Sequence, residues 1–232
     1  MKRLASVDEL NSKEFRQFMS SVNDFAMDHR LRVHTNWSKV WEYPWTWQYI
    51  RRFPFPKITI LDIGSELSPM PWYFASLGAR VTMVETKKSY VAKWRRLRKK
   101  LGFAIDWALV SGPELPFAED RFDLVTSYSV IEHIPDKASA VREAIRVLKP
   151  GGVLCLTFDI CEPSLGMVFP EWNGAAFDMA SFDRLVWNCE MLQPLDAKAQ
   201  WNVEDIQPFL EWHLQSAPHH KYVVAGALML KR

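Results

Sequence analysis

Hydrophobic and polar residues follow two different periods along the chain. Between residues 8 and 30, apolar side chains recur every three or four positions with charged residues between them, which is typical of an amphipathic helix. From residue 57 onward, short β-branched runs alternate with segments of helical period. The pattern therefore predicts a helical N-terminal segment followed by alternating strands and helices.

The alternating part of the chain is expected to form one sheet. Parallel neighbouring strands need crossover helices between them. The expected fold is therefore α/β, with a doubly wound, mostly parallel, Rossmann-like sheet of the seven-stranded type and an N-terminal helical extension. The predicted strands are 57–64, 79–85, 103–110, 121–130 and 151–160, and the helices between them are 69–78, 87–101 and 136–149.

Residues beyond 160 carry a weaker pattern. Helices are predicted near 181–189 and 202–215, and a last strand within 220–232. The position of a sixth strand stays open, with Glu190–Leu195 as its candidate. We divide the chain into an N-terminal helical and aromatic extension that acts as a lid, residues 1–56, and a Rossmann-like domain, residues 57–232.

Composition narrows the functional classes. The 29 Lys and Arg residues against 27 Asp and Glu residues give a net charge of +2, which argues against a nucleic-acid partner. The three cysteines form no CxxC pair, so we expect a reducing compartment, no disulfide framework and no zinc ribbon. His213, His219 and His220 lack a HExxH arrangement, so we expect no metal site. The longest apolar stretch, Tyr222–Leu230, is too short to span a bilayer. We expect a soluble, cytoplasmic protein without a transmembrane segment.

The loops after the first two predicted strands carry candidate ligand-binding residues, because ligands of a doubly wound sheet bind outside the carboxyl ends of its strands. Gly64 stands alone where a nicotinamide dinucleotide would need GxGxxG, and Glu66 would repel a diphosphate. Asp62 before that glycine and Glu85 at the tip of the second strand suit another ligand, since a carboxylate there can accept both ribose hydroxyls of an adenosine. This combination points to S-adenosylmethionine.

At these positions the chain resembles the class I S-adenosylmethionine-dependent methyltransferases, particularly the small-molecule, type 11-like branch that includes quinone-biosynthesis enzymes. The resemblance covers roughly residues 57–160. It implies S-adenosylmethionine as cofactor and SN2 transfer of a methyl group to a small-molecule or sugar-containing acceptor. It rests on ILDIG (60–64), Glu85, LPFAEDRFDLVTSYSVIEHI (115–134) and RVLKPGGVLCLTF (146–158), which occur in the family's order.

The resemblance also implies a set of cofactor-binding residues. Two features depart from the family pattern: Glu66 and Ser68 stand where the loop usually has glycine, and Ser111 stands where an acid usually holds the adenine amino group. Glu66 either pairs with the methionine ammonium or points to water. The implied set is Asp62, Gly64 and Ser65 around the methionine part, Glu85 at the ribose, Ser111 and Gly112 near the adenine, and Ser127 and Tyr128 near the sulfonium, with Glu66 as a further cofactor-binding candidate.

The residues expected near the acceptor each have two possible roles, one in binding or catalysis and one in packing. His133 is a candidate general base for a hydroxyl acceptor, or it belongs to the start of the next helix and packs locally. The aromatic segment 36–56 either stacks a flat or sugar-like acceptor, with Trp41, Tyr43 and Trp45 as the substrate contacts, or packs the N-terminal helix onto the core. A lid of residues 30–55 and 160–180 would exclude water from the reaction.

Two other functions stay open. A catalytically inactive binding or scaffold protein of the same fold would account for the altered glycine loop and for Ser111. An RNA or lipid-head-group methyltransferase would use the basic helix 87–100, whose charges are also explained by a solvated helix face. The sequence leaves open the oligomeric state, the methyl acceptor and the acceptor atom.

Overall fold

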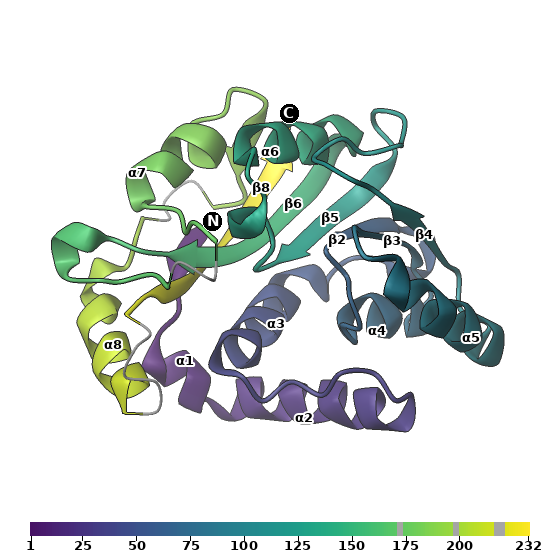
Figure 1. Cartoon of the computed structure of the whole chain (residues 1–232), viewed down its shortest axis with the longest axis horizontal. Helices are drawn as coiled ribbons and strands as arrows, with labels where there is room; N and C mark the ends of the chain where they lie inside the picture. Colours follow the sequence, from purple (N-terminus) through teal and green to yellow (C-terminus); the bar gives the residue numbers. More distant parts are fainter. Residues whose placement is uncertain (171–173, 197–199, 216–220) are drawn as a thin grey trace.

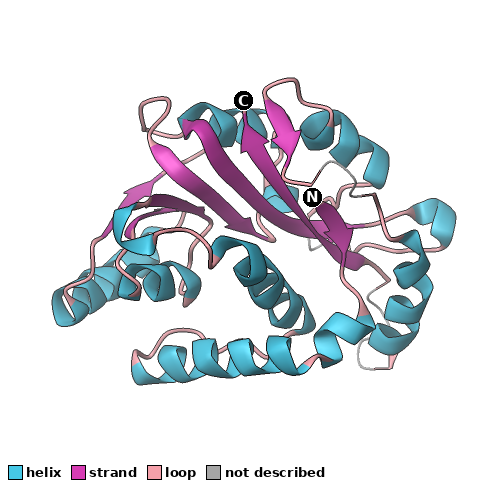
Figure 2. Cartoon of the chain, turned by 180° about the vertical axis from the view of Figure 1, so that it is seen from behind, coloured by secondary structure: helices cyan, strands magenta, loops and turns pink. Residues whose placement is uncertain are grey.

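The computed structural model describes residues 1–170, 174–196, 200–215 and 221–232. Residues 171–173 of the expected lid and residue 220 of the expected last-strand segment lie outside these ranges. Within them, eight strands form one mixed sheet with helices on both faces (Figures 1 and 2). The strands are β1 (Lys2–Leu4), β2 (Thr59–Ile63), β3 (Arg80–Glu85), β4 (Ile105–Leu109), β5 (Phe122–Tyr128), β6 (Leu148–Ile160), β7 (Leu192–Pro194) and β8 (Val223–Lys231).

The sheet has the strand order β1-β8-β6-β5-β2-β3-β4, and β7 pairs with the same edge of β8 as β1. Strands β4, β3, β2, β5 and β6 are parallel, whereas β8 runs antiparallel to β6. The predicted doubly wound, mostly parallel sheet is confirmed. β7 falls inside the candidate segment for the sixth strand. β1 was not predicted, because three residues are too few to establish a period.

Helices cover both faces of the sheet, with α6 and α7 on one side and α2, α3 and α4 on the other (Figure 1). The predicted helix at 8–30 is two helices, because extended backbone at Ser12 interrupts it and the Ser12 hydroxyl caps α2. None of the helices in the described ranges is long and apolar enough to cross a membrane. The helices are α1 (Val7–Asn11), α2 (Lys13–Asp28), α3 (Trp37–Ile50), α4 (Met70–Ser76), α5 (Val91–Leu101), α6 (Lys137–Val147), α7 (Met179–Phe182) and α8 (Ile206–Leu214), and a π-helical turn over Asp183–Trp187 follows α7.

The aromatic segment forms helix α3, which packs the N-terminal part of the chain onto the sheet. Trp41 and Trp45 lie one turn apart, are fully buried, and stack with ring centroids 5.1 Å apart. Gly226 of β8 makes room for the second ring, because a Cβ atom at that position would lie 2.3 Å from Trp45. The packing interpretation of the aromatic segment therefore describes most of its tryptophans.

Chain connections diverge between β2 and β5. These strands are neighbours in the sheet. The chain continues from β2 to β3, which lies on the side of β2 away from β5, and from β5 to β6, which lies on the side of β5 away from β2. Crossovers leaving the carboxyl ends of two such strands go to opposite faces of the sheet and open a crevice between them. The loops that carry the predicted ligand-binding residues meet at this crevice.

Candidate functional site

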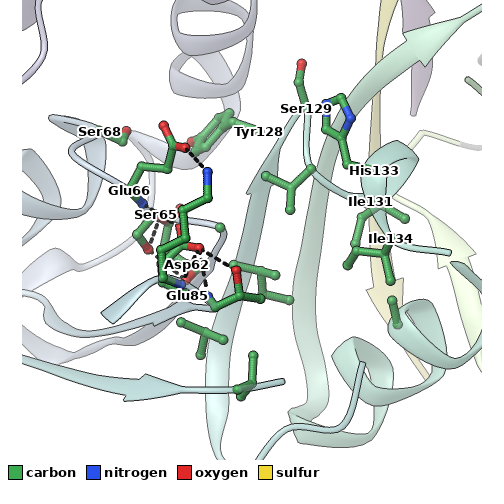
Figure 3. Close-up of a pocket in the computed structure, with 18 of the residues that line it drawn as sticks. Asp62, Ser65, Glu66, Ser68, Glu85, Tyr128, Ser129, Ile131, His133 and Ile134 are labelled. Atoms are coloured by element: carbon green, nitrogen blue, oxygen red, sulfur yellow. Dashed lines mark hydrogen bonds and ion pairs between the residues drawn. The ribbon is translucent and has the colours of Figure 1, made fainter. Parts of the chain in front are cut away.

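The carboxyl ends of β2, β3, β4 and β5 surround a cavity of about 700 Å³. Its walls come from the loops after these strands and from the segment that leads into α3. In Figure 3, Asp62, Ser65 and Glu85 lie on one side of the cavity and Ile131, His133 and Ile134 on the other. The predicted residues that line it are Tyr43, Asp62, Gly64, Ser65, Glu66, Glu85, Ser111, Gly112, Tyr128 and His133.

Three predicted site residues do not line this cavity. Trp41 and Trp45 are fully buried in the core, and the Trp41 indole N–H donates a hydrogen bond to Glu9 Oε2 at 2.8 Å. Ser127 is fully buried within β5. Successive helix positions point to different sides. Among the aromatic residues expected to contact the acceptor, Tyr43 alone therefore lies on the cavity wall, which corrects the expectation for Trp41 and Trp45.

Asp62, at the end of β2, is a buried carboxylate with two hydroxyl partners. Its Oδ2 accepts a hydrogen bond from Ser65 Oγ at 2.6 Å, and its Oδ1 accepts one from Thr126 Oγ1 at 2.7 Å. Burial raises the pKa of Asp62 from its usual 3.8 to about 6, and the two hydroxyl groups oppose that rise. The group is thus ionised at neutral pH, where a cationic ligand part would stabilise its buried charge.

Glu85, at the end of β3, is held by main-chain N–H groups. Its Oε1 accepts hydrogen bonds from Thr86 N at 2.7 Å and Lys87 N at 3.2 Å. Its Oε2 accepts one from Glu66 N at 3.2 Å. A carboxylate oxygen offers about two lone-pair positions, so Oε2 keeps capacity for a ligand hydroxyl. The carboxylate is therefore oriented before any ligand arrives.

Gly64 brings the loop after β2 against the loop after β5. It has a φ of +76°, which disfavours residues with a side chain. A Cβ atom at this position would lie 2.4 Å from Val130 Cγ2, which is closer than real Cβ contacts. Gly64 is thus required at this position for two reasons: its left-handed backbone and the lack of room for a Cβ atom beside Val130.

Glu66 occupies a position where the family usually has glycine, and its backbone is left-handed, with a φ of +43°. Its Oε2 accepts a hydrogen bond from the Arg32 guanidinium, and its Oε1 accepts one from Tyr90 Oη at 3.2 Å. Lys87 Nζ lies 3.8 Å from Oε1. The carboxylate is held by protein groups while the side chain stays 33% exposed, so neither of the two interpretations offered by the sequence describes its position.

Tyr43 connects α3 to both loops of the crevice. Its hydroxyl oxygen lies 3.0 Å from Ser68 Oγ, the other residue that stands in for a glycine. Its ring meets the Tyr128 ring edge to face, with centroids 5.0 Å apart. Burial raises the pKa of Tyr43 above its usual value, so the phenol is neutral. Two neutral aromatic rings therefore form this part of the wall.

Sequence reasoning missed the cations and polar groups that α3 and its preceding segment bring to the cavity. Lys39 Nζ donates hydrogen bonds to Glu42 Oε2 at 2.7 Å and to the main-chain oxygen of Tyr128 at 3.0 Å. The spacing of Lys39 and Glu42 on one helix could have indicated this ion pair. The missed residues in this segment are Arg32, His34, Asn36 and Lys39.

The two polar residues of the EHI motif have different positions. His133 is exposed on the cavity wall, at the end of a 3-10 helix formed by Ile131–His133. Glu132 is buried, and its Oε1 accepts a hydrogen bond from Asp159 N at 3.1 Å. Burial, with the neighbouring Asp159 carboxylate, raises the pKa of Glu132 well above its usual value. Glu132 thus links the loop after β5 to β6, and His133 is the member that a ligand can reach.

The cavity wall beside β4 is largely apolar. Val84, Val110 and Leu115 line it, next to the exposed Ser111 and Gly112. Apolar walls with a few polar groups are typical of sites for flat ring systems. Ser111 offers a hydroxyl where the family usually has an acid.

Part of the chain is similar to known methyltransferases. Residues 61–156 match the family model described as "Methyltransferase domain". A ubiquinone biosynthesis O-methyltransferase from Paramagnetospirillum magneticum is 36% identical over 100 residues, which make up 43% of this chain and 40% of the relative. The chain thus matches less than half of the length of this curated relative.

Solved structures share the fold over nearly the whole chain. The geranyl diphosphate C-methyltransferase from Streptomyces coelicolor, in complex with Mg²⁺, geranyl diphosphate and S-adenosyl-L-homocysteine, has a TM-score of 0.64 at 12% identity and covers 96% of this chain and 99% of that one. The [4+2]-cyclase SpnF has a TM-score of 0.64 at 17% identity, with 96% of each chain covered. At these identities the similarity shows the fold alone, and a fold does not assign an activity.

The family match covers most of the cavity-lining residues but not the N-terminal wall between Arg32 and Tyr43. It includes the loop after β2, the tip of β3 and the loop after β5. The comparisons give no support to a non-catalytic role or to an RNA or lipid-head-group methyltransferase. Residues 61–156 thus match the methyltransferase family model, in agreement with the resemblance of the sequence to the class I S-adenosylmethionine-dependent methyltransferases.

Proposed function

We propose that this protein transfers the methyl group of S-adenosylmethionine to a small-molecule acceptor. One observation carries the proposal: Asp62, Gly64 and Glu85, which come from two neighbouring parallel strands, line a single cavity at the switch point of the sheet. The match of residues 61–156 to the methyltransferase family supports the same reading.

The cavity wall fits the three parts of the cofactor. The ionised Asp62 carboxylate suits the methionine ammonium, and Glu85 Oε2 has room for a ribose hydroxyl. The apolar wall of Val110 and Leu115 suits the adenine. When bound, S-adenosylmethionine supplies a methyl group on a positively charged sulfur.

The protein's contribution to the reaction is orientation, shielding and proton acceptance. The faces of Tyr43 and Tyr128 offer negative electrostatic potential to a nearby cation. Lys39 and Tyr43 cover the cavity from α3 and restrict water around the reacting atoms. Holding an acceptor nucleophile in line with the methyl group accounts for most of the rate gain in such a transfer. We assign to His133 the acceptance of the proton that a hydroxyl acceptor loses.

The acceptor is a small molecule in this proposal. A cavity of about 700 Å³ is of the size that ordinarily encloses small ligands rather than a polymer segment. The relative from Paramagnetospirillum magneticum, named for ubiquinone biosynthesis, supports a quinone-related acceptor for this chain. The polar groups of Lys39, Ser129 and His133 would contact it.

The test is calorimetric titration of S-adenosylmethionine and S-adenosylhomocysteine into the wild-type protein and into Glu85→Gln. We expect binding by the wild type and at least a tenfold loss of affinity in the variant, because a charge-assisted hydrogen bond contributes about 1.5–3 kcal/mol. Glu14→Gln is the matched control, since Glu14 forms an exposed ion pair with Arg51 away from the cavity.

Two outcomes would reject the proposal. One is absence of heat and of thermal stabilisation in the wild type at millimolar ligand, since a ligand at 100 times its dissociation constant stabilises by about 2.7 kcal/mol. The other is binding without transfer of a radiolabelled methyl group to any fraction of a small-molecule extract or to quinone precursors.

A further inference from the structure

Glu66 lies in the loop between β2 and α4, residues 64–69, which we call the cofactor loop. It connects this loop to three other parts of the chain. Its side chain meets Arg32 in the segment before α3 and Tyr90 beside α5. Its main-chain N–H donates to Glu85 Oε2 at 3.2 Å, and its main-chain oxygen accepts from Trp94 Nε1 at 2.7 Å. One residue thus makes contacts with both its side chain and its backbone.

The backbone at this position is one that glycine would adopt with less strain. Glu66 has a φ of +43°, in the left-handed region where a side chain is disfavoured. Left-handed backbone at a non-glycine residue persists where the surrounding contacts hold it in place. The contacts of the Glu66 carboxylate with Arg32, Tyr90 and Lys87 are of that kind.

Among the partners of Glu66, Arg32 belongs to the N-terminal part of the cavity wall. Besides its ion pair with Glu66, Arg32 donates its main-chain N–H to Leu67 O at 3.1 Å. Two residues further on, His34 N donates to Asn23 Oδ1 at 3.0 Å. Residues 32–39 supply the polar N-terminal wall of the cavity. Arg32 thus joins this wall to the cofactor loop through both its side chain and its main chain.

We propose that Glu66 is a positioning residue that fastens segment 31–36 to the cofactor loop, so that the cavity wall and the Glu85 carboxylate are in place before the cofactor binds. The proposal rests on the function proposed above. Glu66 would raise cofactor affinity without touching the cofactor, because a preformed site needs less ordering on binding. A glycine at this position would adopt the left-handed backbone with less strain, but it would remove the side-chain contacts that hold the wall in place.

The test compares Glu66→Gly, Glu66→Gln, Arg32→Gln and the double variant Arg32→Gln/Glu66→Gln with the wild type. Affinity for S-adenosylhomocysteine is measured by calorimetry, and hydrogen exchange of segment 31–36 is measured without ligand. We expect about a tenfold loss of affinity and at least threefold faster exchange in each variant. We also expect the double variant to be no worse than Glu66→Gln, because both single changes break one contact.

A matched pair controls for the loss of an exposed ion pair as such. Arg51→Gln and Glu14→Gln remove a similar pair, with N···O at 3.3 Å, away from the cavity, and should change neither readout. Thermal melting shows whether each variant is folded, and Glu66→Gly is expected to fold because it relieves left-handed strain.

Three outcomes would overturn the proposal. Unchanged affinity in Glu66→Gly, whatever the exchange, would mean that the side chain is merely tolerated. Lower affinity with unchanged exchange would mean that Glu66 acts on the ligand directly. Additive losses in the double variant would separate Arg32 from Glu66. If the wild type bound no S-adenosylhomocysteine, the proposed function would fail, and unchanged exchange in segment 31–36 would still reject the fastening role.

Discussion

Lys39 Nζ, on helix α3, donates a hydrogen bond to the main-chain oxygen of Tyr128, the last residue of β5, at 3.0 Å. The same ammonium donates to Glu42 Oε2, and Glu42 Oε1 accepts a hydrogen bond from Ser129 Oγ at 2.5 Å. These contacts fasten the helix across the sheet end at which the cavity opens. They also place a fully buried carboxylate, Glu42, next to one cation.

Replacing Lys39 by Met should destabilise the fold more than replacing the whole ion pair. The single change leaves the buried Glu42 carboxylate without its cation, at a cost of about 3 kcal/mol in the free energy of unfolding. The double variant Lys39→Met/Glu42→Gln should recover part of this loss. Urea denaturation measures both, with Lys99→Met on the exposed face of α5 as control. Equal losses in the single and double variants would contradict the argument.

Gly64→Ala should disrupt the crevice, whereas Gly112→Ala in the same cavity should not. The first change places a Cβ atom 2.4 Å from Val130 Cγ2 at a φ of +76°, and we expect a loss of about 2–4 kcal/mol from overpacking and backbone strain. At Gly112 an added Cβ meets no atom within 4 Å, and φ is not in the left-handed region. Thermal unfolding measures both. Similar melting temperatures for the two variants would refute this account.

Adding Val130→Ala to Gly64→Ala separates the two causes. The smaller side chain removes the clash and should restore part of the lost stability. The strain of the left-handed backbone remains, at about 1–2 kcal/mol. Complete recovery would mean that the backbone conformation has no cost at this position.

The stability of the fold should depend on pH through Asp62. Burial raises the pKa of this carboxyl to about 6 in the folded protein, against 3.8 when unfolded. Between these values the folded state binds more protons than the unfolded state, so stability falls as pH rises through this window, by about 3 kcal/mol in total. Asp62→Asn should lack this fall. Urea denaturation of both proteins from pH 4 to pH 7 tests the prediction, and parallel curves would disprove it.

Gly226→Ala should destabilise the core although the site is remote from the cavity loops. The added Cβ would lie 2.3 Å from the Trp45 ring, and overpacking of this kind costs about 1–3 kcal/mol. Trp45→Phe in the same chain removes the clashing ring and should recover part of the loss. Denaturant midpoints of the two single variants and the double variant measure this coupling. Additive effects would show that the two residues do not meet.

The parallel part of the fold could be predicted from the sequence because its signals are local. Each predicted strand of the sheet overlaps a strand of the structure, although β6 begins at Leu148, inside the predicted helix 136–149. The loop residues Asp62, Gly64 and Glu85 meet because parallel strands end on one side. The split at Ser12 was not predicted, because the apolar period continues through a residue whose hydroxyl caps α2.

The N-terminal wall of the cavity could not be predicted, because it depends on contacts between distant segments. Arg32, His34 and Lys39 reach the cavity only after α3 has packed on the sheet, and no spacing in the sequence indicates that packing. The aromatic residues were interpreted as one group, yet Trp41 and Trp45 face the core while Tyr43 faces the cavity. A helical wheel separates these directions only once the helix bounds are known.

The pairing of β1 with β8 bears on the order in which the chain can fold during synthesis. Arg3 lies opposite Gly226, so β1 cannot pair until a strand far later in the chain has been synthesised. Closing so long a loop comes late in folding, after local pairs have formed. β7 depends on the same strand. A nascent chain without residues 223–231 would therefore hold the cavity loops on an unfinished sheet, with the far edge of β6 still exposed.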